Sequence, residues 1–363
     1  MSGNISILQV SPTGYSKNSV IGGGEKYVLY VDHALRRAAA EMQIPLATSI
    51  LVLDGESAAV VADHGIDCHV LPGRAWDPFS IDACALEEQL KSFDRIYIHQ
   101  CLCQVGLFAA AHARLLGKVV IGADSGAGEY QLIKSNPEIA RIYSGFHAYS
   151  RFAQNGFSEF DVPVHLIYGP VDTDVYRCAG DAKRDPTRVL AIGRILPHKG
   201  FERIIEALPK ALFLTIVGSP YDKDYVAFLR KNVAGKNVQF SSDLSDAELR
   251  ALILRAGLFV HASTHFDYQG RYHHKPELLG LAPLEALSSG LPTFVSDAGS
   301  LPELADLPGC WCFHDTVELA RLFEAYQNGS LEAPPADEMH AAVTHRYGPL
   351  QFGEQLLKAL KVC

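Results

Sequence analysis

The chain has 363 residues, of which 48% are hydrophobic and 20% charged, a composition typical of globular rather than disordered proteins. This length fits two domains of ordinary size. Acidic residues outnumber basic ones in both parts of the chain, with 15 against 11 in residues 1–150 and 26 against 21 in the remainder. We therefore expect no nucleic-acid partner, and the charge gives no support for peripheral docking to an anionic membrane.

The sequence shows no targeting or membrane-spanning pattern. No charged region followed by an apolar run opens the chain, and no apolar run approaches the length of a membrane span. The eight cysteines follow no spacing of a secreted disulfide scaffold, so we expect reduced thiols. These features predict a cytoplasmic protein, and nothing in them indicates an oligomeric state.

The chain begins with the pattern of a strand, a glycine-rich loop and a helix. Residues 5–10 are an apolar run that predicts a buried strand, and residues 25–42 carry apolar side chains at the spacing of one helix face. Gly22, Gly23 and Gly24 directly precede this helix. Adjacent glycines let backbone approach a phosphate or a sugar closely, although a flexible surface loop is an equal alternative.

Apolar runs then alternate with helix-like segments in two successive series. The runs of the first series are 47–53, 95–99, 119–123, 147–150 and 164–168, and those of the second are 189–192, 212–217, 238–240, 258–261 and 292–296. Alternation of this kind predicts parallel, doubly wound sheets. We therefore expect two αβα domains whose ligands bind at the carboxyl ends of the strands.

Two cysteine clusters and a group of histidines are candidate metal sites. His99, Cys101 and Cys103 share one face if their strand continues, while Cys310 and Cys312 form a second pair. Neither cluster supplies four zinc ligands at the usual spacings, so we predict no metal. Four further histidines fit the wall of a polar pocket at least as well: His261, His265, His273 and His274.

The loop that follows residue 192 reads G-R-I-L-P-H-K-G and places two cations at a strand end. Arg194 and Lys199 there are suited to clamp a diphosphate, the first through a fork of donors and the second as a point charge. The alternative is an ordinary solvated basic pair.

The segment E-L-L-G-L-A-P-L-E-A-L-S-S-G, residues 277–290, predicts a short helix with Pro283 in its first turn and Gly290 as its stop. Glu277 then lies in the loop before the helix and Glu285 lies just over one turn inside it. The free N–H groups at such a helix start favour anionic or hydroxyl-rich ligands. The alternative is an amphipathic helix with two solvated glutamates.

Five motifs occur in one order over residues 189–304: V-L-A-I-G-R-I-L-P-H-K-G-F, I-V-G-S-P, V-Q-F-S-S-D-L-S-D-A-E-L, E-L-L-G-L-A-P-L-E-A-L-S-S-G and L-P-T-F-V-S-D-A-G-S-L-P-E-L. In this order the chain resembles retaining glycosyltransferases of family 4, the group 1 glycosyltransferases. Residues 1–172 resemble the family more loosely, through G-G-G-E-K-Y, His99, Ser150 and Y-G-P-V-D-T-D-V-Y.

The resemblance implies an α/β fold of the GT-B class, with two facing Rossmann-like domains, parallel sheets and an inter-domain cleft. The first domain would span residues 1–172, bind the acceptor and be completed by a C-terminal helix within 350–363. The second would span residues 173–349 and bind the nucleotide sugar.

The resemblance also implies a metal-independent retaining glycosyltransferase that moves a sugar from a nucleotide-diphosphate sugar, UDP- or GDP-linked, to a hydroxyl of a sugar or small-molecule acceptor. No cofactor is implied beyond this co-substrate. The implied catalytic residues are Glu277 and Asp124, and the implied acceptor-binding residues are Glu25 and His99. The implied donor-binding residues are Gly23, Gly24, Arg194, Lys199, Gly218, Leu244, Gly280, Leu281, Ala282 and Glu285.

Three features depart from the family pattern. Asp124 stands where the family has a histidine, Leu279 replaces a phenylalanine, and the loop 263–276 is longer and rich in aromatic residues. A carboxylate accepts hydrogen bonds from sugar hydroxyls but donates none unless it is protonated. The first departure keeps a catalytically silent sugar-nucleotide binding protein open as an alternative. A GT-B sugar-nucleotide epimerase is a second alternative, which is disfavoured because Glu277 and Glu285, with Arg194 and Lys199, resemble the transferase pattern.

Overall fold

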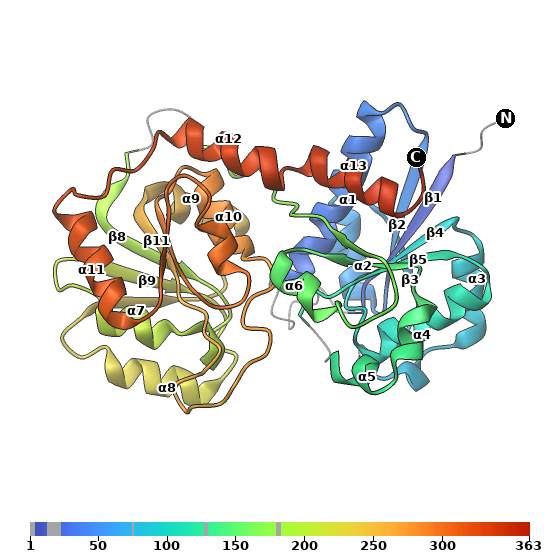
Figure 1. Ribbon diagram of the computed structural model, residues 1–363, viewed down its shortest axis with the longest axis horizontal. Coiled ribbons are helices and arrows are strands. Elements are labelled where there is room, and N and C mark those ends of the chain that lie inside the picture. The colour runs from blue at the N-terminus through green and yellow to red at the C-terminus, as the bar shows by residue number, and fades with distance from the viewer. Residues whose placement is uncertain (1–3, 13–22, 75, 127–129, 179–182) are drawn as a thin grey trace. The chain divides into compact units, whose positions relative to one another are not determined.

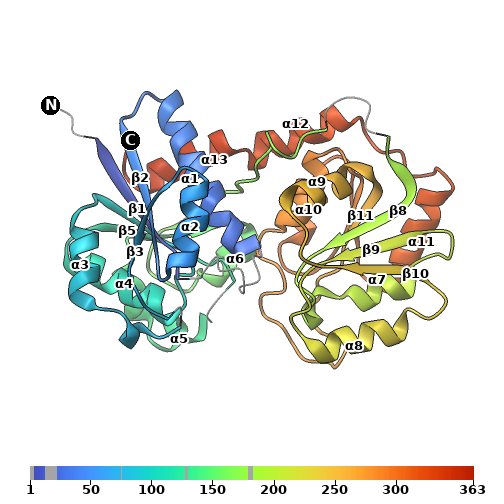
Figure 2. The same ribbon diagram turned by 180° about the vertical axis from the view of Figure 1, so that it is seen from behind.

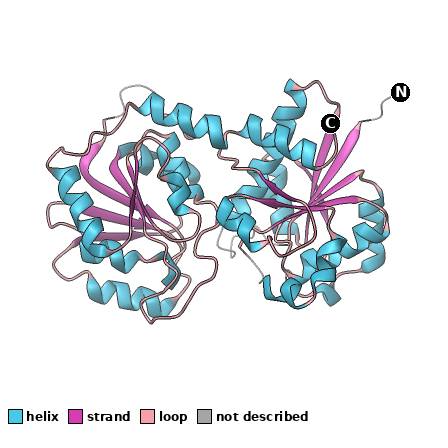
Figure 3. Cartoon of the chain, in the orientation of Figure 1, coloured by secondary structure: helices cyan, strands magenta, loops and turns pink. Residues whose placement is uncertain are grey.

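The computed structural model describes residues 4–12, 23–74, 76–126, 130–178 and 183–363 (Figure 1). The chain divides into two compact units, the first formed by Met1–Pro170 with Tyr347–Cys363 and the second by Val171–Arg346. Each unit is built on one parallel sheet with helices on both faces (Figure 3). The prediction of two doubly wound αβα architectures is therefore confirmed.

The sheet of the first unit has the strand order β3-β2-β1-β4-β5-β6-β7, with neighbours parallel throughout. Its strands are β1 (Ile5–Val10), β2 (Leu46–Val52), β3 (Asp67–Val70), β4 (Arg95–Ile98), β5 (Val119–Ala123), β6 (Gly145–Ala148) and β7 (Val164–Leu166). The sequence predicted every strand except β3. That edge strand reads D-C-H-V and contains no apolar run, so periodicity could not reveal it.

The longest helix of the first unit is α1 (Gly23–Glu41), whose predicted apolar face is buried at Val28, Val31, Leu35 and Ala38. The C-terminal helix α13 (Pro349–Ala359), predicted at 351–362, lies against α1 (Figure 1). The other helices of this unit are α2 (Gly55–Asp63), α3 (Ala83–Lys91), α4 (Gln104–Leu115), α5 (Tyr130–Ser135) and α6 (Arg151–Gly156).

The sheet of the second unit has the order β10-β9-β8-β11-β12-β13, again with parallel neighbours. Its strands are β8 (Asp185–Ile192), β9 (Phe213–Val217), β10 (Asn237–Ser241), β11 (Ala256–His261), β12 (Thr293–Ser296) and β13 (Cys310–Phe313). The sequence missed only β13, another short edge strand.

Two groups of helices cover the second sheet, with α7 and α8 on one face and α9 and α10 on the other (Figure 2). The helices are α7 (Phe201–Ala207), α8 (Lys223–Asn232), α9 (Asp246–Arg255), α10 (Leu281–Ser288), α11 (Thr316–Gln327) and α12 (Ala336–Tyr347). Short 3₁₀ turns occur at Pro78–Ser80, Pro137–Ile142, Pro197–Lys199 and Leu301–Leu304. A capping box of Ser245 and Glu248 fixes the start of α9.

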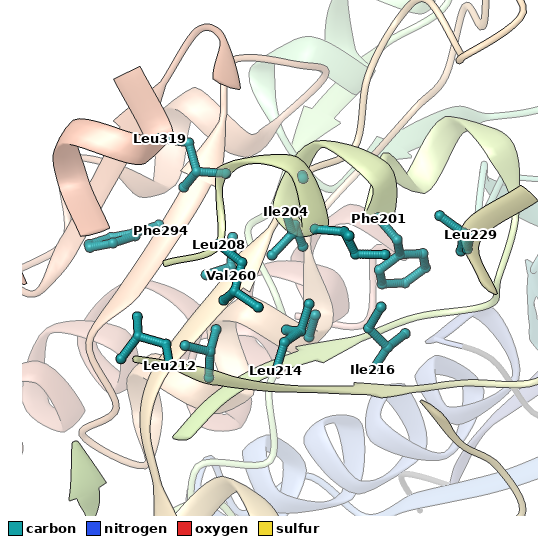
Figure 4. Packing of buried hydrophobic residues seen from close by; sticks show 14 of the residues in the cluster. Phe201, Ile204, Leu208, Leu212, Leu214, Ile216, Leu229, Val260, Phe294 and Leu319 are labelled. Carbon is teal, nitrogen blue, oxygen red and sulfur yellow. The ribbon is translucent and has the colours of Figure 1, made fainter. Parts of the chain in front are cut away.

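A hydrophobic core joins α7 to the middle of the second sheet (Figure 4). Phe201 and Ile204 of α7 pack with Ile216 of β9 and Val260 of β11, and all four are buried. Burying one side chain of this size stabilises the fold by about 1.5–3 kcal/mol. This packing fixes the ends of β8 and β11, from which the loops of the candidate site emerge.

Both sheets reverse their strand order at one place, between β1 and β4 in the first unit and between β8 and β11 in the second. At such a switch point the loops after the two neighbouring strands run to opposite faces of the sheet, and a crevice forms between them. Open parallel sheets bind ligands in this crevice. Within the described ranges, no helix is both long and apolar enough to cross a bilayer.

Candidate functional site

Three polar side chains converge at the switch point of the second unit. The ammonium nitrogen of Lys199 lies 2.9 Å from Glu277 Oε2, and His261 Nε2 lies 2.8 Å from the same oxygen. These residues come from the turn after β8, the end of β11 and the loop before α10. Lys199 and His261 precede Glu277 by 78 and 16 positions in the sequence, and the fold brings both to the same carboxylate oxygen.

The charge state of this cluster follows from its contacts. Burial opposes ionisation of Glu277, but the charge of Lys199 and the hydrogen bond from His261 hold the pKa of the carboxyl well below its usual range. Burial lowers the pKa of His261, although its bond to Glu277 opposes this. His261 is therefore neutral near pH 7, and its Nε2–H donates to the ionised Glu277.

The backbone after β8, which leads to Lys199, packs closely against the backbone after β9. A Cβ atom on Gly218, after β9, would lie 1.8 Å from the carbonyl oxygen of Gly193, so glycine lets the two strand ends meet. The adjacent Arg194 is exposed, with its guanidinium 6.0 Å from the ring centre of Tyr221. Across the described residues no carboxylate pairs with Arg194, so its charge is available to an anionic ligand.

Helix α10 starts four residues after Glu277, and the N–H groups of its first two residues have no partner among the described residues. Gly280 precedes it with φ of +82°, a left-handed conformation that favours glycine. The N–H groups of Leu281 and Ala282 precede the helical hydrogen-bond ladder, and Pro283 has none to satisfy. The N-terminal end of α10 therefore offers two donors and a partial positive charge.

The two glutamates of this segment are not solvated, as the alternative interpretation required. Glu285 on α10 is 4% exposed, and the side chain of Glu277 is 16% exposed. Leu244, a further predicted donor residue, is half-buried and precedes the Ser245 cap of α9. The N–H of Gly218 donates to Ser241 O, which brings the end of β10 next to the end of β9.

The long loop 263–276 is organised around a buried carboxylate. Asp267 Oδ1 accepts from the backbone N–H groups of Gln269 and Arg271, and its Oδ2 lies 3.1 Å from Arg271 Nε and 3.0 Å from His273 Nε2. Burial opposes ionisation of Asp267, but these donors outweigh it and lower its pKa to about 2. The loop is thus held by local hydrogen bonds.

Aromatic contacts attach this loop to the unit and leave part of it exposed. Tyr268 stacks on Phe228 of α8 with ring centres 4.2 Å apart. Phe266 and Tyr272 form a bridge and are 62% and 50% exposed. His265 Nδ1–H donates to His273 O, and its Nε2 accepts from the N–H of Gly299. The loop therefore presents an aromatic surface close in sequence to Glu277.

The predicted residues of the first unit lie around its own switch point. A Cβ on Gly24 would lie 3.3 Å from Gln100 Nε2 and 3.4 Å from Ser125 O, so the start of α1 meets the ends of β4 and β5. Gly23 is the first residue of α1, and Glu25 lies in its first turn. Gly22 lies outside the described residues.

Asp124 follows β5 and is 1% exposed. Its Oδ1 accepts from the N–H of Gly126 at 2.9 Å, so the carboxylate shapes its own loop. The neighbouring Ser125 hydroxyl lies 2.8 Å from the Tyr149 hydroxyl.

His99 ends a buried polar relay. Its Nε2 lies 3.0 Å from Gln9 Oε1, and Gln9 Nε2 donates to Asp32 Oδ1 at 3.1 Å. Arg36 Nε donates to the other oxygen of Asp32 at 2.7 Å. Burial, with a smaller effect from His147, lowers the pKa of His99 to about 3. His99 is therefore neutral, its Nε2–H donates to Gln9, and its buried Nδ1 has no partner among the described residues.

Neither cysteine cluster forms a metal site within the described residues, where no group of three or more His, Cys, Asp or Glu side chains has metal-binding geometry. The strand before Cys101 ends at Ile98, and Gln100 has φ of +55°, so His99, Cys101 and Cys103 do not continue a strand face. Cys310 and Cys312 lie on β13.

Sequence reasoning placed His261 in the wall of a possible polar pocket but did not predict its contact with Glu277, and it gave no role to Ser263 or Gln100. Ser263 Oγ lies 3.1 Å from His261 Nε2 and Ser263 is fully buried. The signal available for His261 was a histidine at the carboxyl end of a buried strand in a switch-point loop. Gln100 gives no such signal, because its place depends on a left-handed backbone that the sequence does not predict.

Known proteins resemble the chain in sequence and in structure. Residues 172–308 match the family model described as Glycosyl transferases group 1. A GDP-mannose:cellobiosyl-diphosphopolyprenol alpha-mannosyltransferase of Xanthomonas campestris is 35% identical over 164 residues, which cover 42% of this chain and 40% of the relative.

Two solved structures cover nearly the whole chain. The Anabaena protein HepE in complex with UDP and glucose has a TM-score of 0.76 at 17% identity, covering 99% of this chain and 100% of that one. A glycosyltransferase from Rickettsia africae has a TM-score of 0.77 at 14% identity, covering 99% and 98%. At these identities the likeness shows the fold alone.

The resemblance to group 1 glycosyltransferases is thereby confirmed over the greater part of the second unit. The GT-B fold, with its two Rossmann-like units, is confirmed for the chain. The chain spans about two fifths of the length of the first curated relatives it matches.

Proposed function

We propose that the chain is a group 1 glycosyltransferase that moves a sugar from a nucleotide-diphosphate sugar, UDP- or GDP-linked, to an acceptor hydroxyl, with retention of configuration and without a metal. The family match over residues 172–308 supports the sugar transfer. The observation that carries the proposal is the ionised Glu277 held by Lys199 and His261 at the switch point of the second unit.

The second unit is assigned the donor. Arg194 and Lys199 neutralise the diphosphate. The guanidinium of Arg194 is exposed and pairs with no carboxylate of the described residues, and the ammonium of Lys199 has a further hydrogen besides the one it donates to Glu277. The N–H groups of Leu281 and Ala282 bind hydroxyl or phosphate oxygens, and Glu285 accepts from the ribose hydroxyls. Gly218, Leu244 and Gly280 shape the surrounding backbone.

The proposed chemistry follows from the charges that develop. The bond between the anomeric carbon and the phosphate oxygen breaks while the acceptor oxygen bonds to that carbon on the same face. The acceptor proton passes to the departing phosphate oxygen. Glu277 stabilises the positive charge at the sugar, and Arg194, Lys199 and the start of α10 stabilise the negative charge of the leaving group.

The first unit is assigned the acceptor, which we propose to be a sugar or a small molecule. Glu25 and the neutral His99 bind its hydroxyls. We propose that Gly23 and Gly24 offer the backbone N–H groups at the start of α1 to the donor phosphates. We also propose a catalytic role for Asp124, which replaces the family histidine. Its carboxylate accepts a hydrogen bond from a hydroxyl of the donor sugar but supplies no neutral donor.

Transfer assays in EDTA test the proposal. The full chain is incubated with UDP- and GDP-sugars and a panel of sugar acceptors, and the anomeric configuration of the product is read by proton NMR. We expect nucleotide release coupled to a glycoside with the configuration of the donor. Turnover only after a divalent metal is restored would contradict metal independence, and an inverted product would contradict retention.

The same assay separates the alternatives. Binding of a nucleotide sugar without any turnover identifies a catalytically silent binding protein. Conversion of the donor to an isomer without acceptor identifies an epimerase. Either result would overturn the transferase proposal.

A further inference from the structure

Both hydrogen bonds to the Glu277 side chain reach the same oxygen. Lys199 Nζ and His261 Nε2 lie 2.9 and 2.8 Å from Oε2. Within the described part of the chain, no donor reaches Oε1. The two contacts therefore fix the carboxylate plane and leave one oxygen open to a ligand.

The two partners differ in rigidity and in charge. Lys199 has a long flexible side chain on a 3₁₀ turn, whereas His261 is the last residue of a central strand and is 7% exposed. Its register in the sheet is set by pairing with Val295 of β12. Lys199 supplies charge to Glu277, while His261 supplies a direction, because a ring on a buried strand has few alternative orientations.

Ser263 completes the support of the ring. Its hydroxyl oxygen lies 3.1 Å from His261 Nε2, and Ser263 is fully buried. Because the Nε2–H donates to Glu277, the Ser263 oxygen receives the same hydrogen as a weaker second acceptor. His261 thus keeps its proton on Nε2, the nitrogen that faces the carboxylate.

We propose that His261 is a positioning residue that holds Glu277 in one orientation and presents Oε1 to the reacting sugar. This inference rests on the proposed function, since it concerns how Glu277 acts in sugar transfer. It predicts that His261 affects the chemical step more than donor affinity, because the imidazole is 7% exposed and its Nε2–H is used by Glu277.

Two substitutions separate a hydrogen-bonding role from a packing role. His261→Phe keeps a flat ring of similar size but removes the donor, and His261→Gln restores an N–H at the distal position. We expect His261→Phe to lower kcat by about 10- to 100-fold, with the donor Kd changed less than about threefold. His261→Gln should recover most of the loss. The matched control is His314→Phe. His314 also pairs with a carboxylate, at 2.9 Å from Asp297, but its side chain is exposed.

Unchanged kcat in a folded His261→Phe variant would overturn the inference. An equal loss in the Phe and Gln variants would also overturn it, because packing would then explain the effect. Circular dichroism and thermal melting establish folding for each variant.

NMR of the full chain tests the same inference without activity. Carbon-13 detection of the Glu277 carboxyl gives its pKa, and nitrogen-15 detection gives the tautomer of His261. We expect a carboxyl pKa below its usual range, an Nε2–H tautomer, and a higher carboxyl pKa in His261→Phe. If the wild-type chain transfers no sugar, the proposed function fails, while these NMR results still support or overturn the contact between His261 and Glu277.

Discussion

The two units share one topology but carry different chemistry at the same place. Each sheet reverses its order beside its first strand, β1 or β8. In the second unit that point holds an ionised carboxylate paired with a lysine. In the first unit it holds the neutral His99, linked through Gln9 to Asp32.

This difference fits the separate tasks of a transfer reaction. Charge develops at the anomeric carbon and on the leaving diphosphate, so fixed charges are useful where the donor binds. The proposed acceptor hydroxyl is neutral, so a neutral group such as His99 is suited to bind it beside the carboxylate of Glu25. The topology places a site at the switch point, and the residues at the strand ends decide what the site does.

Loss of the Glu277 charge tests the comparison most severely. We expect Glu277→Gln to lower kcat by about 10²- to 10³-fold, because a charge that stabilises the transition state is removed. The donor Kd should change little, since Arg194 and Lys199 remain. The exposed Glu324→Gln on α11 is the control, and unchanged turnover in Glu277→Gln would remove Glu277 from the site.

Loss of the Lys199 charge should act on binding first. We expect Lys199→Met to weaken donor affinity by about 10- to 100-fold, as a charge-assisted hydrogen bond contributes about 1.5–3 kcal/mol. It also leaves Glu277 without its cation, so the carboxyl pKa should rise. Calorimetric titration measures both effects against the exposed Lys231→Met control. Equal donor affinity in the two variants would contradict the assignment of Lys199 to the diphosphate.

Breaking the relay of the first unit should affect stability and leave the donor site intact. Gln9→Leu leaves His99 Nε2 and Asp32 Oδ1 buried without their partner. We expect the free energy of unfolding to fall by about 1–3 kcal/mol per unsatisfied group. Urea unfolding and nucleotide affinity are compared with those of Gln351→Leu, at an exposed position on α13. A large loss of nucleotide affinity would show that the units are not chemically separate.

Acid titration tests whether His99 is buried in its neutral form. The folded pKa of His99 is lowered to about 3, below its ordinary value of 6.5. Between these values the unfolded state binds a proton that the folded state does not, so stability falls as pH decreases from about 6.5 towards 3.

The variant His99→Asn has no imidazole to bind this proton in the unfolded state. Its free energy of unfolding should therefore fall less steeply with acid, by up to about 1.4 kcal/mol per pH unit. Urea unfolding at several pH values measures the slopes. Identical slopes for variant and wild type would mean that His99 is not buried in the neutral form.

Sequence reasoning was strongest where the signal is local. Apolar runs and helical spacing located most strands and the helices α1, α7 and α10, and Gly290 ends α10 with a left-handed φ of +70°. The edge strands β3 and β13 were not predicted. β3 reads D-C-H-V and contains no apolar run, and the cysteines of β13 were interpreted as a possible metal-binding pair. Motif order over residues 189–304 predicted the resemblance to group 1 glycosyltransferases, and the family model matches residues 172–308.

Contacts between distant residues could not be predicted in the same way. The hydrogen bond between His261 and Glu277 depends on the path of the loop 263–276, which the composition of the loop does not reveal. The relay of Gln9, Asp32 and His99 joins residues up to 90 positions apart. Such contacts depend on sheet order and side-chain direction, and neither has a local pattern in the sequence.

Calorimetric titration of the wild-type chain with UDP, GDP, ADP and TDP in EDTA tests the central claim most directly, alongside Lys199→Met. The account predicts that one nucleotide series binds without metal and that Lys199→Met weakens it by about 10- to 100-fold. Binding that needs a divalent metal, or binding of equal strength in the variant, would contradict a metal-free donor site built on Lys199 and Glu277.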